Sequence, residues 1–149
     1  MPDTPEAPRP ETIIAFDFGL RRIGIAVGQD VTGSASPLGI VSSGEHGPDQ
    51  VRISELIDEW RPTRLVVGMP AHTDGSPSEM QAHVRAFIRQ LAVYGLPVDT
   101  VDERYTSIEA ESALKEARAT GARGRISKDS IDSAAAVLIA ERYLARKAR

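Results

Sequence analysis

Four acidic residues stand where apolar segments of the sequence begin or end. They are Asp17, Asp102, Glu103 and Asp132. Asp17 interrupts the segment IIAFDFGLRRIGIAVG, which otherwise has the apolar character of buried strands. An ionised carboxylate in such a strand is costly unless something compensates its charge. Asp17 therefore needs a cation, a cluster of backbone N–H groups, or exposure at the end of its strand.

A divalent cation is the compensation that would explain all of these carboxylates together. Asp17, the Asp102–Glu103 pair and Asp132 would repel one another if they met without a cation, and each would raise the pKa of the others. The sequence has no cysteine, and its three histidines lack the spacing of metal ligands. Oxygen ligands alone favour Mg²⁺ or Mn²⁺ over Zn²⁺. The chemistry suited to such a site is phosphoryl transfer.

The elements that must position these carboxylates follow from the periodicity of apolar residues. Five strands are predicted, over residues 13–19, 23–29, 35–44, 64–70 and 96–105. Helices are predicted over residues 53–60, from the capping box Ser76–Glu79 to a stop at Gly95, from the capping box Thr106–Glu109 to Gly121, and over residues 129–144. This order predicts an α/β fold with a mixed five-stranded sheet, an antiparallel three-strand meander plus parallel strands, flanked by helices. Ligands of such sheets usually bind beyond the carboxyl ends of the parallel strands.

Composition predicts one globular domain. The chain has 149 residues, of which 41% are hydrophobic and 26% charged. Residues 1–11 are rich in proline and charge and are predicted to form a disordered arm, which leaves residues 12–149 as the domain. No segment has the length of a membrane span or the pattern of a signal peptide, so we expect a cytoplasmic protein without a membrane partner. The net charge of −3 disfavours non-specific coating of nucleic acid but allows a local basic site.

Several motifs together resemble one known family. AFDFGLRRIGIAVG, VVGMP with a downstream DG, DERYTSIEA and SKDSIDSAAAVLIAERYL resemble the YqgF family, also called RuvX, of pre-16S rRNA nucleases or Holliday junction resolvases. The resemblance covers nearly everything after the arm. It implies a ribonuclease H-like fold, Mg²⁺ or Mn²⁺ as cofactor, hydrolysis of phosphodiester bonds, and a role in processing the 5′ end of 16S rRNA during ribosome biogenesis.

The resemblance also implies roles for individual residues. The family's acidic positions fall on Asp17, on the Asp102–Glu103 pair and on Asp132, and its basic and polar positions fall on Arg22, Arg104, Thr106, Ser107 and Lys128. Arg123 and Arg125 are expected to be outer contacts to the nucleic acid. The partner is precursor rRNA or branched DNA, the ribosome is a candidate partner, and both a monomer and a homodimer remain open.

One departure from the wider resolvase pattern bears on the metal ligands. Resolvases of this fold carry an acid in the strand that reads LVVGMP here, where Gly68 offers no ligand. Asp102 and Glu103 point to opposite faces of a strand, so only one can share the face of Asp17. A replacement from a neighbouring strand must reach further, which favours glutamate. We therefore predict Glu103 as the metal ligand, with Asp17 and Asp132, and Asp102 as an acid that orients Arg104 or the backbone at Thr106.

Two other readings of the sequence remain open. Asp17-Phe18-Gly19 followed by Gly24 is similar to the phosphate-binding turn of actin-like ATPases and sugar kinases, although those enzymes close two such domains around a nucleotide. The second is a non-catalytic RNA-binding protein that retains the fold. Retained carboxylates weigh against it, and a nuclease assay separates the two.

Overall fold

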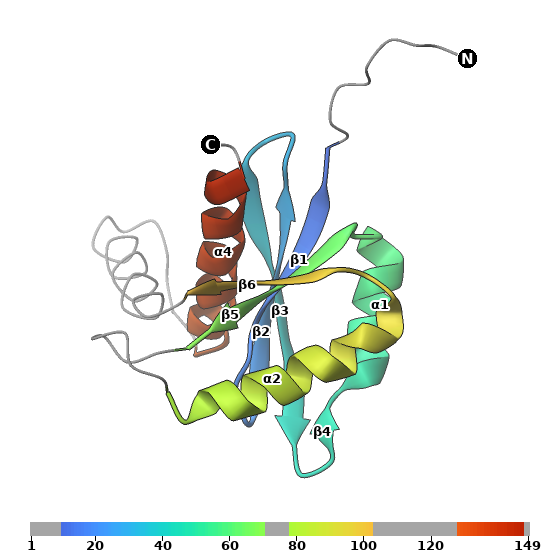
Figure 1. The fold of residues 1–149 in the computed structure, drawn as a ribbon, viewed down its shortest axis with the longest axis vertical. Coiled ribbons are helices and arrows are strands. Elements are labelled where there is room, and N and C mark those ends of the chain that lie inside the picture. Colours follow the sequence, from blue (N-terminus) through green and yellow to red (C-terminus); the bar gives the residue numbers. More distant parts are fainter. Residues whose placement is uncertain (1–9, 71–77, 103–127, 148–149) are drawn as a thin grey trace.

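The computed structural model describes residues 10–70, 78–102 and 128–147. Figure 1 shows a twisted sheet with helices on both of its faces. In chain order the elements are β1 (Thr12–Asp17), β2 (Arg22–Gln29), β3 (Ser34–Gly44), β4 (Gly47–Pro48), α1 (Gln50–Trp60), β5 (Arg64–Met69), α2 (Met80–Leu91), the short 3₁₀ helix η1 (Ala92–Tyr94), β6 (Val98–Asp102) and α4 (Lys128–Lys147).

The sheet is mixed, as the sequence predicts. Its strand order is β4-β3-β2-β1-β5-β6. The pairs β1–β2 and β2–β3 are antiparallel, whereas β5 is parallel to both β1 and β6. The sheet has six strands rather than five, because the two-residue strand β4 pairs with the end of β3. The carboxyl ends of β1, β5 and β6 therefore meet at one edge of the sheet.

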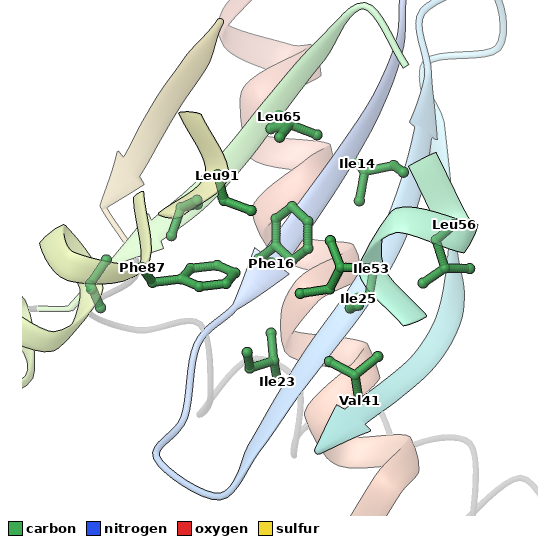
Figure 2. Packing of buried hydrophobic residues seen from close by; sticks show 12 residues of the cluster. Ile14, Phe16, Ile23, Ile25, Val41, Ile53, Leu56, Leu65, Phe87 and Leu91 are labelled. Atoms are coloured by element: carbon green, nitrogen blue, oxygen red, sulfur yellow. The ribbon is translucent and has the colours of Figure 1, made fainter. Parts of the chain in front are cut away.

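Two apolar layers hold the helices on the sheet. On one face, α1 and α2 cover side chains of β1, β2, β3 and β5. The largest buried side chains of this layer, from the strands and from both helices, are Phe16, Ile14, Ile23, Ile25, Ile53, Leu65, Phe87 and Leu91 (Figure 2). On the other face, α4 packs against Ile13, Ala15, Val66 and Val101 through Ile139, Ala140, Tyr143 and Leu144. Side chains thus alternate along β1: Ile14 and Phe16 point toward α1 and α2, whereas Ile13 and Ala15 point toward α4.

Several details of the elements differ from expectation. Strand β3 is continuous past its proline, but its register with β2 shifts between Ile25 and Ala26, opposite Pro37–Gly39. Helix α2 begins at Met80, whose N–H donates to the Oγ of Ser78 at 3.1 Å, so the predicted start at residue 76 is too early. The stop at Gly95 is confirmed by its positive φ of 70°, although α2 itself ends at Leu91. The capping box at Thr106–Glu109 lies outside the described residues.

No helix among those described is long and apolar enough to span a lipid bilayer.

Phe87 joins α2 to the strand that carries Asp17, so its truncation should have a large effect on stability. Its ring is 1% exposed and packs edge-on against Phe16, with ring centroids 5.3 Å apart. We expect Phe87→Ala to lower the free energy of unfolding by about 3–5 kcal/mol. Urea denaturation measures the loss. Val93→Ala, at a residue that is 78% exposed, is the control and should change stability by less than about 0.5 kcal/mol. Equal effects of the two substitutions would contradict this packing.

Candidate active site

Asp17 is the last residue of β1 and is half-buried. Because side chains alternate along a strand, Asp17 belongs to the same face as Ile13 and Ala15, which α4 covers. The carboxylate therefore lies at the carboxyl end of a central strand, on the α4 face of the sheet. Partial exposure at the end of its strand is one of the ways in which the charge of Asp17 can be compensated.

Glycines flank Asp17 on both neighbouring strands. Across the antiparallel pair, Asp17 is matched with Gly24 of β2. On the parallel side the matched residues end with Phe16 and Val67, and the residue that follows Val67 in β5, in line with Asp17, is Gly68. Neither neighbour carries a side chain that could cover the carboxylate on its face. The sequence marks Gly68 only as a missing ligand and Gly24 only as part of a possible phosphate-binding turn, whereas the antiparallel register of the hairpin places Gly24 directly opposite Asp17.

Helix α4 brings position 132 to this end of the sheet. The helix runs opposite to β1 (Figure 1), and a Cβ on Gly28 would lie 3.3 Å from the Cβ of Ala140, which places Ala140 over the pair Ile13–Gly28. Position 132 precedes Ala140 by eight residues, about 12 Å of helix. Asp17 follows Ile13 by four residues, about 13 Å of strand. Position 132 also shares a helix face with the buried Ala135, Ala136 and Ile139, so it lies above the sheet near Asp17.

Asp102 lies on the other face of the sheet. It is matched with Met69 of β5, which packs against the α1 and α2 layer, whereas Val101 packs against α4. The Asp102 side chain is exposed. Its carbonyl oxygen accepts a hydrogen bond of 2.9 Å from Nη1 of Arg142, and the carbonyl of Thr100 accepts one of 3.4 Å from Nη1 of Arg146. The structure therefore does not bring Asp17 and Asp102 together on one face.

The turn after Asp17 is held from both sides. Phe18 packs against Phe87, with ring centroids 5.1 Å apart, and the carbonyl of Arg21 accepts a hydrogen bond of 2.8 Å from the N–H of Ser43. Arg22 opens β2 and, two residues before Gly24, belongs to the face of Asp17. The turn thus fixes an acidic and a basic residue on the same face.

Gly19 allows this turn to close, and its substitution should disturb the positions of Asp17 and Arg22. A Cβ at Gly19 would lie 2.5 Å from the carbonyl oxygen of Arg22, closer than such contacts occur. We expect Gly19→Ala to lower the free energy of unfolding by about 1–3 kcal/mol, because the backbone must shift. Thermal unfolding measures the change. Gly44→Ala is the matched control, since a Cβ there meets nothing within 4 Å. A Gly19→Ala variant as stable as the Gly44→Ala variant would contradict this account.

Much of the predicted site lies outside the described residues. The predicted site residues that the structure does not describe are Glu103, Arg104, Thr106, Ser107, Arg123 and Arg125. Lys128 is the first residue of α4, four residues before Asp132. Among the side chains that the structure describes, those of residues 10–70, 78–102 and 133–146, no group of three acidic or histidine residues gathers closely enough to hold a metal ion. The described part of the site is therefore Asp17, its two glycine neighbours, Arg22 and the first turns of α4.

Comparison with known sequences identifies the family. Residues 11–146 match the model of the family RuvX, described as Holliday junction resolvase. A protein of Burkholderia cenocepacia is 42% identical over 137 residues, which cover 91% of this chain and 90% of the relative. A protein of Azotobacter vinelandii is 41% identical over 139 residues, which cover 93% of this chain and 96% of the relative. Both relatives bear the name "Putative pre-16S rRNA nuclease".

Solved structures agree on the fold. RuvC of Thermus thermophilus, in complex with a Holliday junction substrate, superposes with a TM-score of 0.56 at 17% identity, covering 91% of this chain and 96% of RuvC. The yeast mitochondrial Holliday junction resolvase Ydc2 gives a TM-score of 0.53 at 12% identity, covering 98% of this chain and 82% of Ydc2. The fold is thus ribonuclease H-like. Together with the family match over residues 11–146, this shows that the chain belongs to the RuvX family and is a hydrolase that acts on phosphodiester bonds.

Proposed function

We propose that this protein is a metal-dependent nuclease that processes the 5′ end of pre-16S rRNA. The observation that carries the proposal is the setting of Asp17. It is a half-buried carboxylate at the carboxyl end of a central strand, with a glycine on each side and the start of α4 above it. A carboxylate between two glycines at the carboxyl end of a strand suits a ligand that must approach closely, because neither neighbouring residue carries a side chain.

The residues present fit a hard divalent cation. We propose that Asp17, Glu103 and Asp132 hold Mg²⁺ or Mn²⁺, since carboxylate oxygens are the ligands that these ions prefer. The placement of position 132 over the sheet end that carries Asp17 supports the pairing of those two. When bound, the metal would polarise the phosphodiester and stabilise the attacking and leaving oxygens.

The third carboxylate is proposed to come from Glu103 rather than Asp102. Asp102 belongs to the face of Met69, opposite to the face of Asp17, which weighs against it as a direct ligand. Arg142 and Arg146 of α4 bind the carbonyls of Asp102 and Thr100, so the helix that carries Asp132 is tied to the end of β6. Asp102 would then act on neighbouring groups, Arg104 or the backbone at Thr106, and would not touch the metal.

The basic residues are proposed to bind the nucleic acid backbone. Arg22 shares the face of Asp17, and Lys128 lies one turn before Asp132 on α4. We propose that each holds a phosphate beside the scissile one. Arg104, Thr106 and Ser107 are proposed to act near the end of β6, with Arg123 and Arg125 as outer contacts. We propose that the protein works in the cytoplasm, where precursor rRNA is its partner.

The name shared by the bacterial relatives supports precursor rRNA as the substrate. Four-way DNA is the second candidate, because the family description and the solved structures with this fold are of Holliday junction resolvases. Both substrates present the same phosphodiester.

One assay tests both candidates. The purified chain is offered a 5′-extended 16S rRNA precursor and a four-way DNA junction in parallel, with Mg²⁺, with Mn²⁺ and with EDTA. Metal-dependent cleavage at the precursor's 5′ end, with little cleavage of the junction, is the expected result. Preferential cutting of the junction would instead make four-way DNA the substrate. Binding of RNA without cleavage under every condition would favour the non-catalytic reading.

A further inference from the structure

A small pocket opens beside the turn that follows Asp17. It lies between that turn, the β3–β4 hairpin and α2, and its volume is about 190 Å³. Pockets for drug-sized ligands are larger, about 300–1,000 Å³. The pocket thus has room for a single ring system. Its lining includes the apolar Phe18, Leu20 and Phe87 and the polar Ser43, His83 and Gln90.

We propose that this pocket binds one unpaired nucleobase of the substrate, next to the scissile phosphate. The inference rests on the proposed nuclease function and specifies where one nucleotide of its substrate is held. Asp17 and Phe18 are consecutive and point to opposite faces at the edge of the sheet. A strand of nucleic acid with a phosphate at Asp17 can therefore place a neighbouring base on the other side of this edge.

The chemistry of the lining favours a base over other occupants. Leu20 is 52% exposed although it is a large apolar residue, and it lies beside the aromatic edge formed by Phe18 and Phe87. Apolar and aromatic surfaces stack on the faces of bases, and the hydroxyl, imidazole and amide groups of the lining can pair with base edges.

Charge distinguishes this pocket from its larger neighbour. Among the described residues that line it there is no carboxylate, and Arg21 and Arg22 follow Leu20 directly. The adjoining groove, about 650 Å³ and bordered by Val51, Val93 and Tyr94, includes Glu55 in its wall. There burial and the charge of Asp58 raise the pKa of Tyr94, and the tyrosine hydroxyl lies 2.7 Å from Oε1 of Gln50. A polyanion is better matched to the smaller pocket.

The test combines protein and substrate changes. The cleavage position is first mapped on a single-stranded RNA oligonucleotide with Mn²⁺, and each nucleotide near that position is then replaced singly by an abasic one. We expect one abasic position to lower kcat/KM about tenfold, and Leu20→Ala to lower it about tenfold on the intact oligonucleotide. On that abasic substrate, Leu20→Ala should cause no further loss of kcat/KM. Leu20→Met should retain most of the activity, and Mn²⁺ affinity should be unchanged in both variants.

Val31→Ala is the control, since Val31 is 75% exposed and lies in the turn between β2 and β3. Equal activity of the Leu20→Ala and Val31→Ala variants would overturn the inference. It would also be overturned if Leu20→Ala lowered kcat/KM by the same factor on the abasic oligonucleotide as on the intact one. Equal activity of the two variants would be expected if the pocket binds a side chain of a partner protein instead of a base. If the wild type cuts no oligonucleotide, the proposed function fails in this form. The same substitutions are then compared through the affinity of the oligonucleotides, measured by fluorescence anisotropy in an Asp17→Asn background, where the same two outcomes overturn the inference.

Discussion

Asp17→Asn is expected to abolish metal-dependent cleavage, with a loss of roughly a thousandfold or more. The amide keeps the shape of the side chain but removes the charge that would hold the cation. The fold should survive, because Asp17 lies at the end of β1 and outside both apolar layers. Stability without metal should stay the same or rise, since repulsion between carboxylates is relieved. Cleavage rate, circular dichroism and thermal unfolding with and without Mn²⁺ measure these effects.

Asp58→Asn is the control for this experiment. Asp58 is exposed on α1, on the face of the sheet away from α4, and its substitution removes the same charge. It should leave cleavage within twofold of the wild type. An Asp17→Asn variant with the activity of the wild type would eliminate the metal-nuclease proposal, whereas a variant that fails to fold would show that Asp17 has a structural role.

The second large effect separates the two neighbouring acids at the end of β6. Glu103→Gln should reduce turnover by at least a hundredfold and weaken Mn²⁺ binding, because a direct ligand loses its charge. Asp102→Asn should cost about tenfold or less and leave Mn²⁺ affinity nearly unchanged. The physical reason is that Asp102 belongs to the face of Met69, away from Asp17.

Turnover and Mn²⁺ titration of the two variants form the measurement, and each variant is the control for the other. If Asp102→Asn loses the metal while Glu103→Gln retains it, the assignment is reversed although a carboxylate site remains. If neither substitution affects cleavage, the third ligand does not come from this strand.

The part of the fold that local chemistry determines could be predicted from the sequence. The hairpin of β1 and β2, the strand β5 and the stop at Gly95 each follow from residues close together in the chain. The start of α2 could not be located, because the pattern Ser76–Glu79 resembles a capping box, whereas in the structure the helix begins at Met80 and the Oγ of Ser78 accepts the hydrogen bond of its N–H. The pairing of β4 depends on contact with the end of β3, which no local signal marks.

From the residues themselves, the sequence indicates the candidate site mainly through its acidic positions. Asp17 is conspicuous in an apolar strand, and the helical spacing of the alanines after Asp132 indicates the face on which that residue lies. The glycines beside Asp17 become meaningful only when the register of β1 with β2 and β5 is known. Register between β1 and β5 is set by packing across the whole sheet, so the spacing of residues in one chain segment does not reveal it.

The hydrogen bonds of Arg142 and Arg146 have a consequence for how the protein meets other chains. Strand β6 is at the border of the sheet, and the carbonyl of Pro97 accepts a bond from Leu65 of β5, so the carbonyls of residues 98, 100 and 102 point outward by alternation. A border strand with open acceptors is a template on which a strand of another molecule can add. Two guanidinium groups occupy the carbonyls of Thr100 and Asp102. This arrangement discourages edge-to-edge aggregation along β6, the strand that leads to Glu103.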